Sequence, residues 1–139
     1  MHRRLLTCLA IIGAAGCTSE PAATVQIVSP RHGAIIQADS VRVVLSASGI
    51  EIVAADGQAT HGRAHHHVIL DNLLPAAGQP IPGNIPSIVH LGTGDSVMVL
   101  RDVEPGGHRL IAVLALGNHV PLDPWVVDTV EFSTVAPRE

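Results

Sequence analysis

The chain has 139 residues, of which 47% are hydrophobic and 14% are charged, and its formal net charge is −4. This length accommodates one domain with a sizeable core, and the apolar content excludes a disordered, highly charged tail. Lysine and tyrosine are absent and Trp125 and Phe132 are the only aromatic residues, which argues against a nucleic-acid binder, because such proteins need a basic face and stacking aromatics.

The N-terminus has the pattern of a bacterial export signal. A basic stretch, Met1–Arg4, precedes an apolar run over residues 5–15, as in a signal peptide. The run is too short for a transmembrane helix, which needs about 20 apolar residues. It ends in Ala14-Ala15-Gly16-Cys17, which resembles a lipobox, the signal for acylation of a bacterial cysteine. We therefore expect a lipoprotein signal peptide over residues 1–16 and membrane anchoring through lipidated Cys17.

This interpretation leaves no cysteine for other chemistry and predicts where the protein is located. Cys8 lies within the predicted signal and Cys17 carries the lipid, so no cysteine remains for a disulfide, thiol catalysis or a cysteine-ligated metal. Residues 17–24 form the lipidated cysteine and a short polar tether. Thr18 stands where many lipoproteins of the inner membrane have Asp, which favours the outer membrane. The sequence predicts a lipid-anchored protein of the cell envelope, on the periplasmic side.

Downstream of the tether, β-branched runs alternate with turn signals about every ten residues. The runs predict seven short strands, over residues 25–28, 41–45, 50–54, 65–70, 96–100, 109–116 and 126–135. No window shows helical periodicity with capping residues. The pattern predicts an all-β fold, an immunoglobulin-like two-sheet antiparallel sandwich, in a single domain over residues 25–136.

Two segments of this domain have unusual patterns. Arg109–Leu116 is apolar on both faces, as expected of a central strand with one face sealed by a loop. Leu74–Pro86 contains four Pro and two Gly, so we expect a long loop, and loops of this length are often functional. The core is predicted to be aliphatic, with Phe132 and Trp125 as its large side chains.

Several motifs occur together in a known family. They are Val28–Gly33, Ala64–Asp71 with its triple His, Gly78–Pro82, Val89–Gly92, Pro105–His108 and Leu116–Pro121. With these motifs in this order between Val25 and Val135, the chain resembles the bacterial family called domain of unknown function 4399. The resemblance implies a small β domain at the cell envelope, and the family has no established activity.

The chain departs from the family pattern at three places. Ala64 stands where the family usually has Gly before the triple His, and Ile88–Leu91 replaces a His-x-His-Phe type of segment. The family often has a His on both sides of Pro121, whereas here only His119 precedes it. If the family's additional histidines are ligands, this chain has fewer of them.

Histidine is the reactive side chain present in excess, with nine residues. Strand alternation places His65 and His67 on one face, about 6.5–7 Å apart along the strand, where both can reach one metal ion. Asp71 shares this face, as a ligand or as a group that orients a ring. Copper or zinc is the candidate ion, because exported proteins encounter both metals and imidazole suits both. The candidate ligands are His65, His67, His90 and His119, with His61 as a further source of a third ligand.

The alternative is a structural role for the same rings. A histidine on an aliphatic strand is often a buried polar spacer that bonds to a carbonyl group, and His66, in step with Val68 and Leu70, fits that role best. His108 follows a Gly-Gly turn and His32 lies in a turn. A hydrogen-bonded histidine network that ties the Pro-rich loop to the sandwich therefore stands beside the metal site as an interpretation.

Other chemistry has little support in the sequence. There is no Gly-x-Ser-x-Gly elbow, and Gly92–Asp95 forms a turn between strands with no helix behind it to bind phosphate. We therefore expect a lipid-anchored binding or scaffold module, not an enzyme. The alternative function is a periplasmic copper or zinc protein. For the protein as a whole, the expected partners are the membrane, through Cys17, and an envelope protein that binds the loop Leu74–Pro86.

Overall fold

The computed structural model describes residues 22–138. The predicted signal peptide over residues 1–16, the cysteines Cys8 and Cys17, and residues 18–21 of the tether lie outside this range. Within it, no helix has the length and apolar character needed to cross a membrane.

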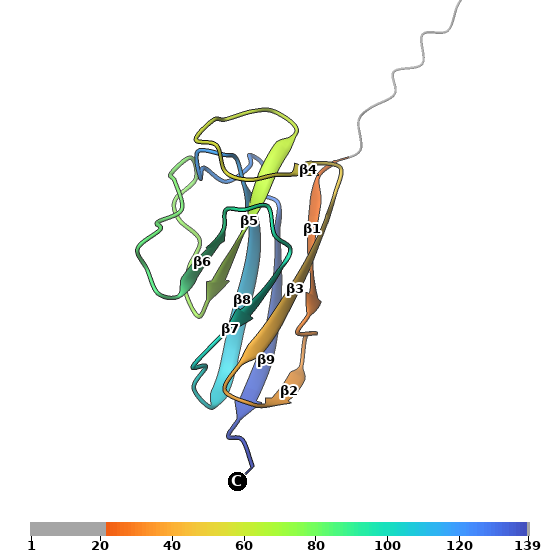
Figure 1. The fold of residues 1–139 in the computed structure, drawn as a ribbon, viewed down its shortest axis with the longest axis vertical. Coiled ribbons are helices and arrows are strands. Elements are labelled where there is room, and N and C mark those ends of the chain that lie inside the picture. The colour runs from red at the N-terminus through yellow and green to blue at the C-terminus, as the bar shows by residue number, and fades with distance from the viewer. Residues whose placement is uncertain (1–21, 139) are drawn as a thin grey trace, which may run out of the picture.

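The described residues form nine β-strands (Figure 1). They are β1 (Thr24–Ser29), β2 (Ala34–Gln37), β3 (Val41–Ser48), β4 (Glu51–Ile52), β5 (Arg63–Leu70), β6 (Ile88–Leu91), β7 (Val97–Leu100), β8 (Gly106–Ala115) and β9 (Val127–Val135). Seven of them overlap the predicted strands. The two others, β2 and β6, are each four residues long.

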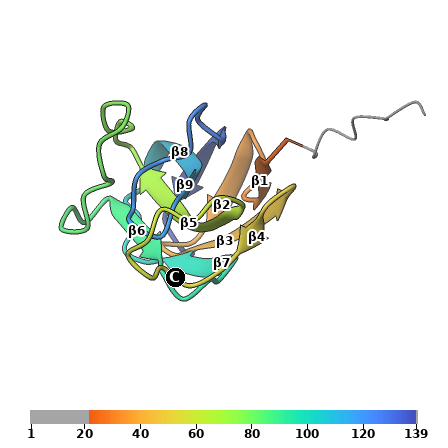
Figure 2. The same ribbon diagram turned by 90° about the horizontal axis from the view of Figure 1, so that it is seen from above.

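The strands form two sheets that face each other (Figure 2). One sheet has the order β1-β3-β7, and the other has the order β2-β9-β8-β5-β4, with β6 beside β5. The fold is therefore the predicted immunoglobulin-like sandwich. Two pairings, β2 with β9 and β4 with β5, are parallel instead of antiparallel. For β2 the reason is that the chain crosses from one sheet to the other without reversing the direction of β1 (Figure 1).

Strand alternation builds the main core between the sheets. Val41, Val43 and Leu45 of β3 point inward and are buried, whereas Arg42 is exposed. From the opposite sheet, β8 contributes Leu110, Ala112 and Leu114, and β9 contributes Val130 and Phe132. Phe132 is thus a core residue, as predicted.

A second apolar cluster covers the outer face of the larger sheet. It contains Ile69 of β5, Ile88 of β6, Ile111, Val113 and Ala115 of β8, and Ile81 of the loop between β5 and β6. This loop (residues 71–87) has no regular secondary structure and lies beside the sheet at the left of Figure 1. Both faces of β8 are therefore covered, one by the opposite sheet and one by the loop, as the apolar run predicts.

The prediction that Trp125 fills the core is wrong. Trp125 is 39% exposed and belongs to neither apolar cluster. It lies in the segment that leads from β8 into β9, where the neighbouring Val126 packs against the main core instead. The core is consequently almost entirely aliphatic.

Candidate metal centre

Strand β5 presents its three histidines to opposite faces of the larger sheet. It lies between β8 and β6 and pairs with both in antiparallel fashion. Because side chains alternate along a strand, Ala64 and Val68 enter the main core, whereas Ile69 enters the cluster on the outer face. His66 shares the inner face with Val68, and His65 and His67 share the outer face with Ile69. All three histidine side chains are fully buried.

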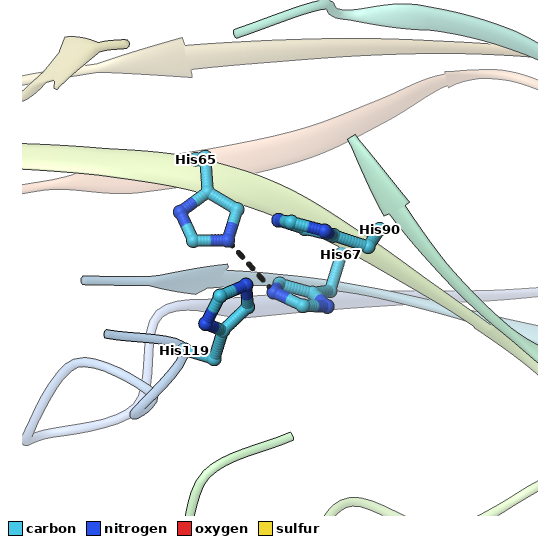
Figure 3. A group of neighbouring side chains, drawn as sticks. All are labelled: His65, His67, His90 and His119. Atoms are coloured by element: carbon cyan, nitrogen blue, oxygen red, sulfur yellow. Dashed lines mark hydrogen bonds between the residues drawn. The ribbon is translucent and has the colours of Figure 1, made fainter. Parts of the chain in front are cut away.

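Two other elements bring histidines to the outer face beside this pair (Figure 3). The register between β5 and β6 places His90 directly opposite His67. His119 lies in the turn after β8, with a φ of 69°, and its N–H donates to the carbonyl of Leu116 at 2.7 Å. The His119 carbonyl in turn accepts a hydrogen bond from the Ile81 N–H at 2.9 Å. His90 is exposed and His119 is half-buried, so the group has two buried members and two at its rim.

The four rings converge on one point. One ring nitrogen from each of His65, His67, His90 and His119 lies within 4.8 Å of the others. The Nε2 atoms of His65 and His67 are 2.9 Å apart, and the His67 and His90 rings are stacked with centroids 4.7 Å apart. The four histidines therefore lie close enough together to bind a metal ion.

The rings of the buried pair have few competing partners. One ring donates a hydrogen bond to the other between their Nε2 atoms, and the Nδ1 atoms of both are buried without a partner among residues 22–138. Burial, reinforced by the neighbouring histidines, lowers the pKa of His65 to about 4 and that of His67 to about 3. Burial and the proximity of His119 also lower the pKa of His90. Both buried rings are neutral at pH 7, so each has one ring nitrogen with the lone pair that a metal requires, and the ring that donates from Nε2 has to shift its proton to Nδ1 in order to bind the ion through Nε2.

His66 has the structural role that its position on the inner face predicts. It is fully buried, and its Nδ1 lies 3.0 Å from the carbonyl oxygen of Asp95. Burial lowers its pKa, and the hydrogen bond to Asp95 opposes this effect. The middle histidine of the triplet thus connects β5 to the turn before β7.

Two of the predicted ligands lie away from the cluster. Asp71 has a φ of 51°, so the chain leaves the strand geometry there. Its carboxylate accepts hydrogen bonds from His108 Nδ1 and from the Arg109 N–H, each at 2.7 Å. His61 is exposed and lines an apolar hollow with Ile50 and Leu122. The expectations that Asp71 orients a ligand and that His61 supplies one are therefore wrong.

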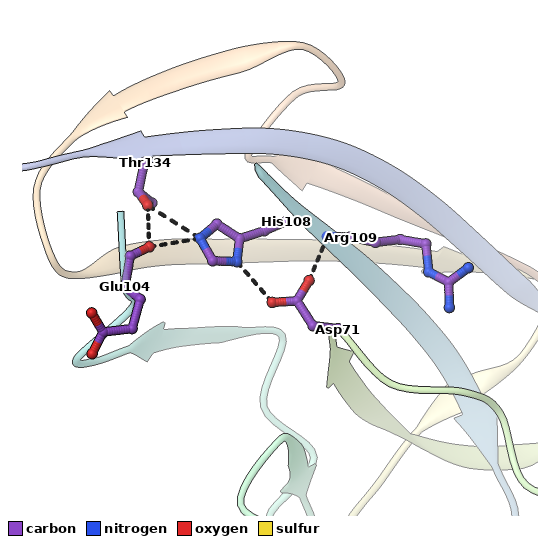
Figure 4. Close-up of polar contacts among 5 residues, drawn as sticks. All are labelled: Asp71, Glu104, His108, Arg109 and Thr134. Atoms are coloured by element: carbon purple, nitrogen blue, oxygen red, sulfur yellow. Dashed lines mark hydrogen bonds and ion pairs between the residues drawn. The ribbon is translucent and has the colours of Figure 1, made fainter. Parts of the chain in front are cut away.

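Asp71, His108 and Thr134 form a second polar cluster that sequence reasoning did not find (Figure 4). The His108 Nδ1 donates to Asp71, and its Nε2 lies 2.8 Å from the Glu104 carbonyl and 3.1 Å from the Thr134 hydroxyl. Since a carboxylate and a carbonyl only accept hydrogen bonds, both ring nitrogens carry protons. Burial lowers the pKa of His108, but the hydrogen bonds to Asp71 and Glu104 and the charge of Asp71 outweigh it, so the pKa is raised.

The composition of this second cluster is that of an acid–histidine–hydroxyl triad, but its geometry does not suit nucleophilic catalysis. Thr134 is 2% exposed, and its hydroxyl donates to the Glu104 carbonyl at 2.6 Å. A protonated His108 has no lone pair to accept the hydroxyl proton, which a general base must do. The cluster therefore joins β8, β9 and the end of β5 as a structural clip.

Among the comparisons with known proteins, the match to a family model identifies the family. Among solved structures, the chain is similar to fibronectin(III)-like modules of CbhA from Clostridium thermocellum, with 12% identity and a TM-score of 0.48 over 83% of this chain and 100% of that chain. It is also similar to the PKD domain of human KIAA0319, with 10% identity and a TM-score of 0.40 over 94% of this chain and 96% of that chain. No curated protein sequence matches it. A family model described as "Domain of unknown function (DUF4399)" matches residues 43–135, a range that contains all four histidines of the cluster. Because this range is more than half of the chain, the protein belongs to the DUF4399 family.

Proposed function

We propose that this chain is a lipid-anchored envelope domain that binds a divalent transition-metal ion, copper(II) or zinc(II), through His65, His67, His90 and His119. The observation that carries the proposal is the convergence of one ring nitrogen from each of these four imidazoles, all within 4.8 Å of one another. Two of the rings are fully buried, and burying polar groups costs hydration free energy. A ligand role gives a reason to retain such a costly arrangement.

The spacing of the nitrogens fits a metal with a small adjustment. With bonds of about 2.0–2.1 Å, two nitrogens at a right angle on one ion lie about 2.9 Å apart, and two opposite nitrogens lie about 4.1 Å apart. The Nε2 atoms of His65 and His67 already have the first spacing, at 2.9 Å. No spacing in the group exceeds 4.8 Å, so an opposite pair of nitrogens has to approach by less than 1 Å (about the difference between these spacings). His90 and His119 are at the rim and have the freedom to make this movement.

The donor set determines which ions fit. Four neutral imidazoles without a thiolate suit copper(II) and zinc(II), and the general order of affinities places copper(II) above zinc(II). The two rim histidines face solvent, so an ion has a direct route to the two buried nitrogens. We therefore expect copper(II) to bind more tightly than zinc(II) and to exchange with chelators in solution.

The proposed location rests on the sequence. The signal-like residues 1–16 and the lipobox at Cys17 support attachment to the cell envelope, where copper and zinc are encountered.

The competing interpretation, a histidine network that ties the loop to the sandwich, has support at His66 and His108, whose rings bond to carbonyl groups. The rings of the four-histidine cluster have no such bonds in the described chain. This difference favours a ligand role for the four-histidine cluster, so we propose a binding module.

The test is a metal titration of the untagged chain from residue 18 to residue 139. We expect saturable binding of one copper(II) ion with a Kd of about 1 µM or below, which corresponds to about −8 kcal/mol. A His65→Ala/His67→Ala variant is expected to lose at least about 100-fold in affinity, or 2.7 kcal/mol. His61→Ala, which removes an exposed histidine outside the cluster, is the matched control and retains full affinity. No saturable binding tighter than tens of micromolar, or equal binding by the double variant, would overturn the proposal.

A further inference from the structure

We infer that Gly92 is a positioning residue of the metal centre, because its missing side chain leaves the space that the His90 ring occupies. A Cβ atom built on Gly92 would lie 2.2 Å from Cε1, 2.5 Å from Nε2 and 2.9 Å from Nδ1 of His90. Carbon atoms in contact lie about 3.5–4.0 Å apart. Any residue other than glycine at position 92 therefore has to displace the ring that the metal centre uses.

The backbone conformation gives no other reason for a glycine at this position. The glycines of the described chain with positive φ are Gly33, Gly49, Gly57, Gly62, Gly78, Gly94 and Gly106. Gly92 is not among them, so an L-residue is compatible with its backbone. Gly92 was predicted only as the start of a turn, and that turn is present. What requires a glycine is the contact with the ring.

The ring of His90 has little space in which to yield while remaining in the cluster. It stacks on His67 with an angle of 19° between the planes, and the centroid of the His119 ring lies 4.5 Å away. His90 is, however, exposed at the rim. A methyl group at position 92 is therefore expected to turn the ring outward, away from the other three nitrogens.

The turn that contains Gly92 is anchored and does not relieve the contact by moving. The Gly92 carbonyl accepts a hydrogen bond from the Ala55 N–H at 2.9 Å. His66 bonds to the Asp95 carbonyl at 3.0 Å. A Cβ on Gly94 would lie 3.0 Å from the backbone of Val53, which shows how closely the two segments pack. The buried His66 thus holds the turn on which the His90 ring rests.

This inference rests on the proposed function, and its test compares Gly92→Ala with His90→Ala in copper(II) titrations of the same untagged chain. We expect Gly92→Ala to reduce the affinity about 10- to 100-fold, as the loss of groups that orient a ligand does. The double variant His90→Ala/Gly92→Ala is expected to bind as His90→Ala does, within about threefold, because both changes remove the same ligand. Electron paramagnetic resonance is expected to show one fewer coordinated imidazole nitrogen in Gly92→Ala than in the wild type.

Gly83→Ala is the matched control. Gly83 also lacks a positive φ, and a Cβ there meets nothing within 4 Å. It is expected to retain wild-type affinity and nitrogen count, so a general effect of replacing glycine by alanine is separated from the contact with His90.

Each other outcome bears on a particular claim. Wild-type affinity and nitrogen count in Gly92→Ala overturn the positioning role while the proposed function stands. If Gly92→Ala does not fold but the double variant does, the contact with the ring is supported, and if neither folds the inference fails. If the wild-type chain binds no copper(II), the proposed function fails, and the inference is overturned unless nuclear Overhauser contacts join the His90 ring to Gly92 in the metal-free chain.

Discussion

The environment of each histidine decides whether its ring is neutral or charged. Burial and mutual proximity lower the pKa values of His65 and His67, because a charged ring loses its hydration there. His108 is half-buried, but its side chain bonds to the Asp71 carboxylate and the Glu104 carbonyl, and its pKa is raised. One sheet thus carries neutral rings suited to a metal and a protonated ring suited to an ion pair.

The protonated His108 is expected to make a pH-dependent contribution to stability. Its pKa in the folded chain lies above the ordinary value of about 6.5, so its contribution is complete below pH 6.5 (about the unfolded pKa) and is lost as the pH rises through the folded pKa. We expect His108→Gln to cost about 1–2 kcal/mol at pH 5.5 and less at pH 8.5, a range reduced because the Asp71 side chain is 45% exposed. Urea unfolding with chelator at both pH values measures the difference, and an equal cost at both contradicts the charged pair.

The loop between β5 and β6 contacts the rest of the domain in two ways, through an apolar side chain and through a backbone hydrogen bond. Its Ile81 side chain is 3% exposed in the outer apolar cluster, and its Ile81 N–H bonds to the His119 carbonyl at 2.9 Å. The loop therefore covers the apolar face of β5 and β8 and also supports a proposed ligand. Deleting it would disturb the four-histidine cluster together with any partner surface, so single substitutions are the better probes of the loop.

Ile81→Ala is expected to destabilise the fold by about 2–4 kcal/mol, because it leaves a cavity beside Ile69 and Ile111. Thermal and urea unfolding of the metal-free chain measure the effect. Leu73→Ala is the control from the same loop. Leu73 is 72% exposed, and its substitution is expected to change stability by less than about 0.5 kcal/mol. Similar small effects of both substitutions would show that the loop does not seal this face of the sheet.

The strands show how far sequence patterns predict elements. The seven predicted strands are those with β-branched runs bounded by turn signals. β2 and β6 were not predicted because each has only four residues and depends on its partner strand. β2 pairs with β9 at the other end of the domain, and β6 pairs with β5 across the long loop. The four ligand candidates followed from alternation along β5 and from two histidines near turns. The role assigned to Asp71 was wrong because a positive φ at the strand end turns its carboxylate toward His108. Gly92 gave no signal, since its importance depends on where a neighbouring ring lies.

The whole metal-free molecule is expected to lose stability in mild acid. His65 and His67 are fully buried, with pKa values of about 4 and 3. In the unfolded chain both take up protons near pH 6.5, at about the ordinary histidine pKa. Because the unfolded state binds more protons, stability falls as the pH drops below about 6.5 and continues to fall through the folded values.

The expected loss between pH 7.5 and pH 4.5 is a few kcal/mol, measured by urea unfolding in the presence of a chelator. A His65→Leu/His67→Leu variant lacks both buried histidines of this face, and its pH dependence over the same range is expected to be much flatter. An unchanged slope in the variant would assign the acid sensitivity to other groups.

The alternation of β5 has a consequence for how this protein evolves. The residues that hold the two sheets together and the two histidines that belong to the four-histidine cluster lie on one strand but project from opposite sides of it. Exchanging a side chain on the outer side leaves the packing between the sheets intact. A proposed ligand on this strand can therefore be lost or replaced while the sandwich is kept, so we expect differences in metal binding between such chains to lie at alternate positions of this strand.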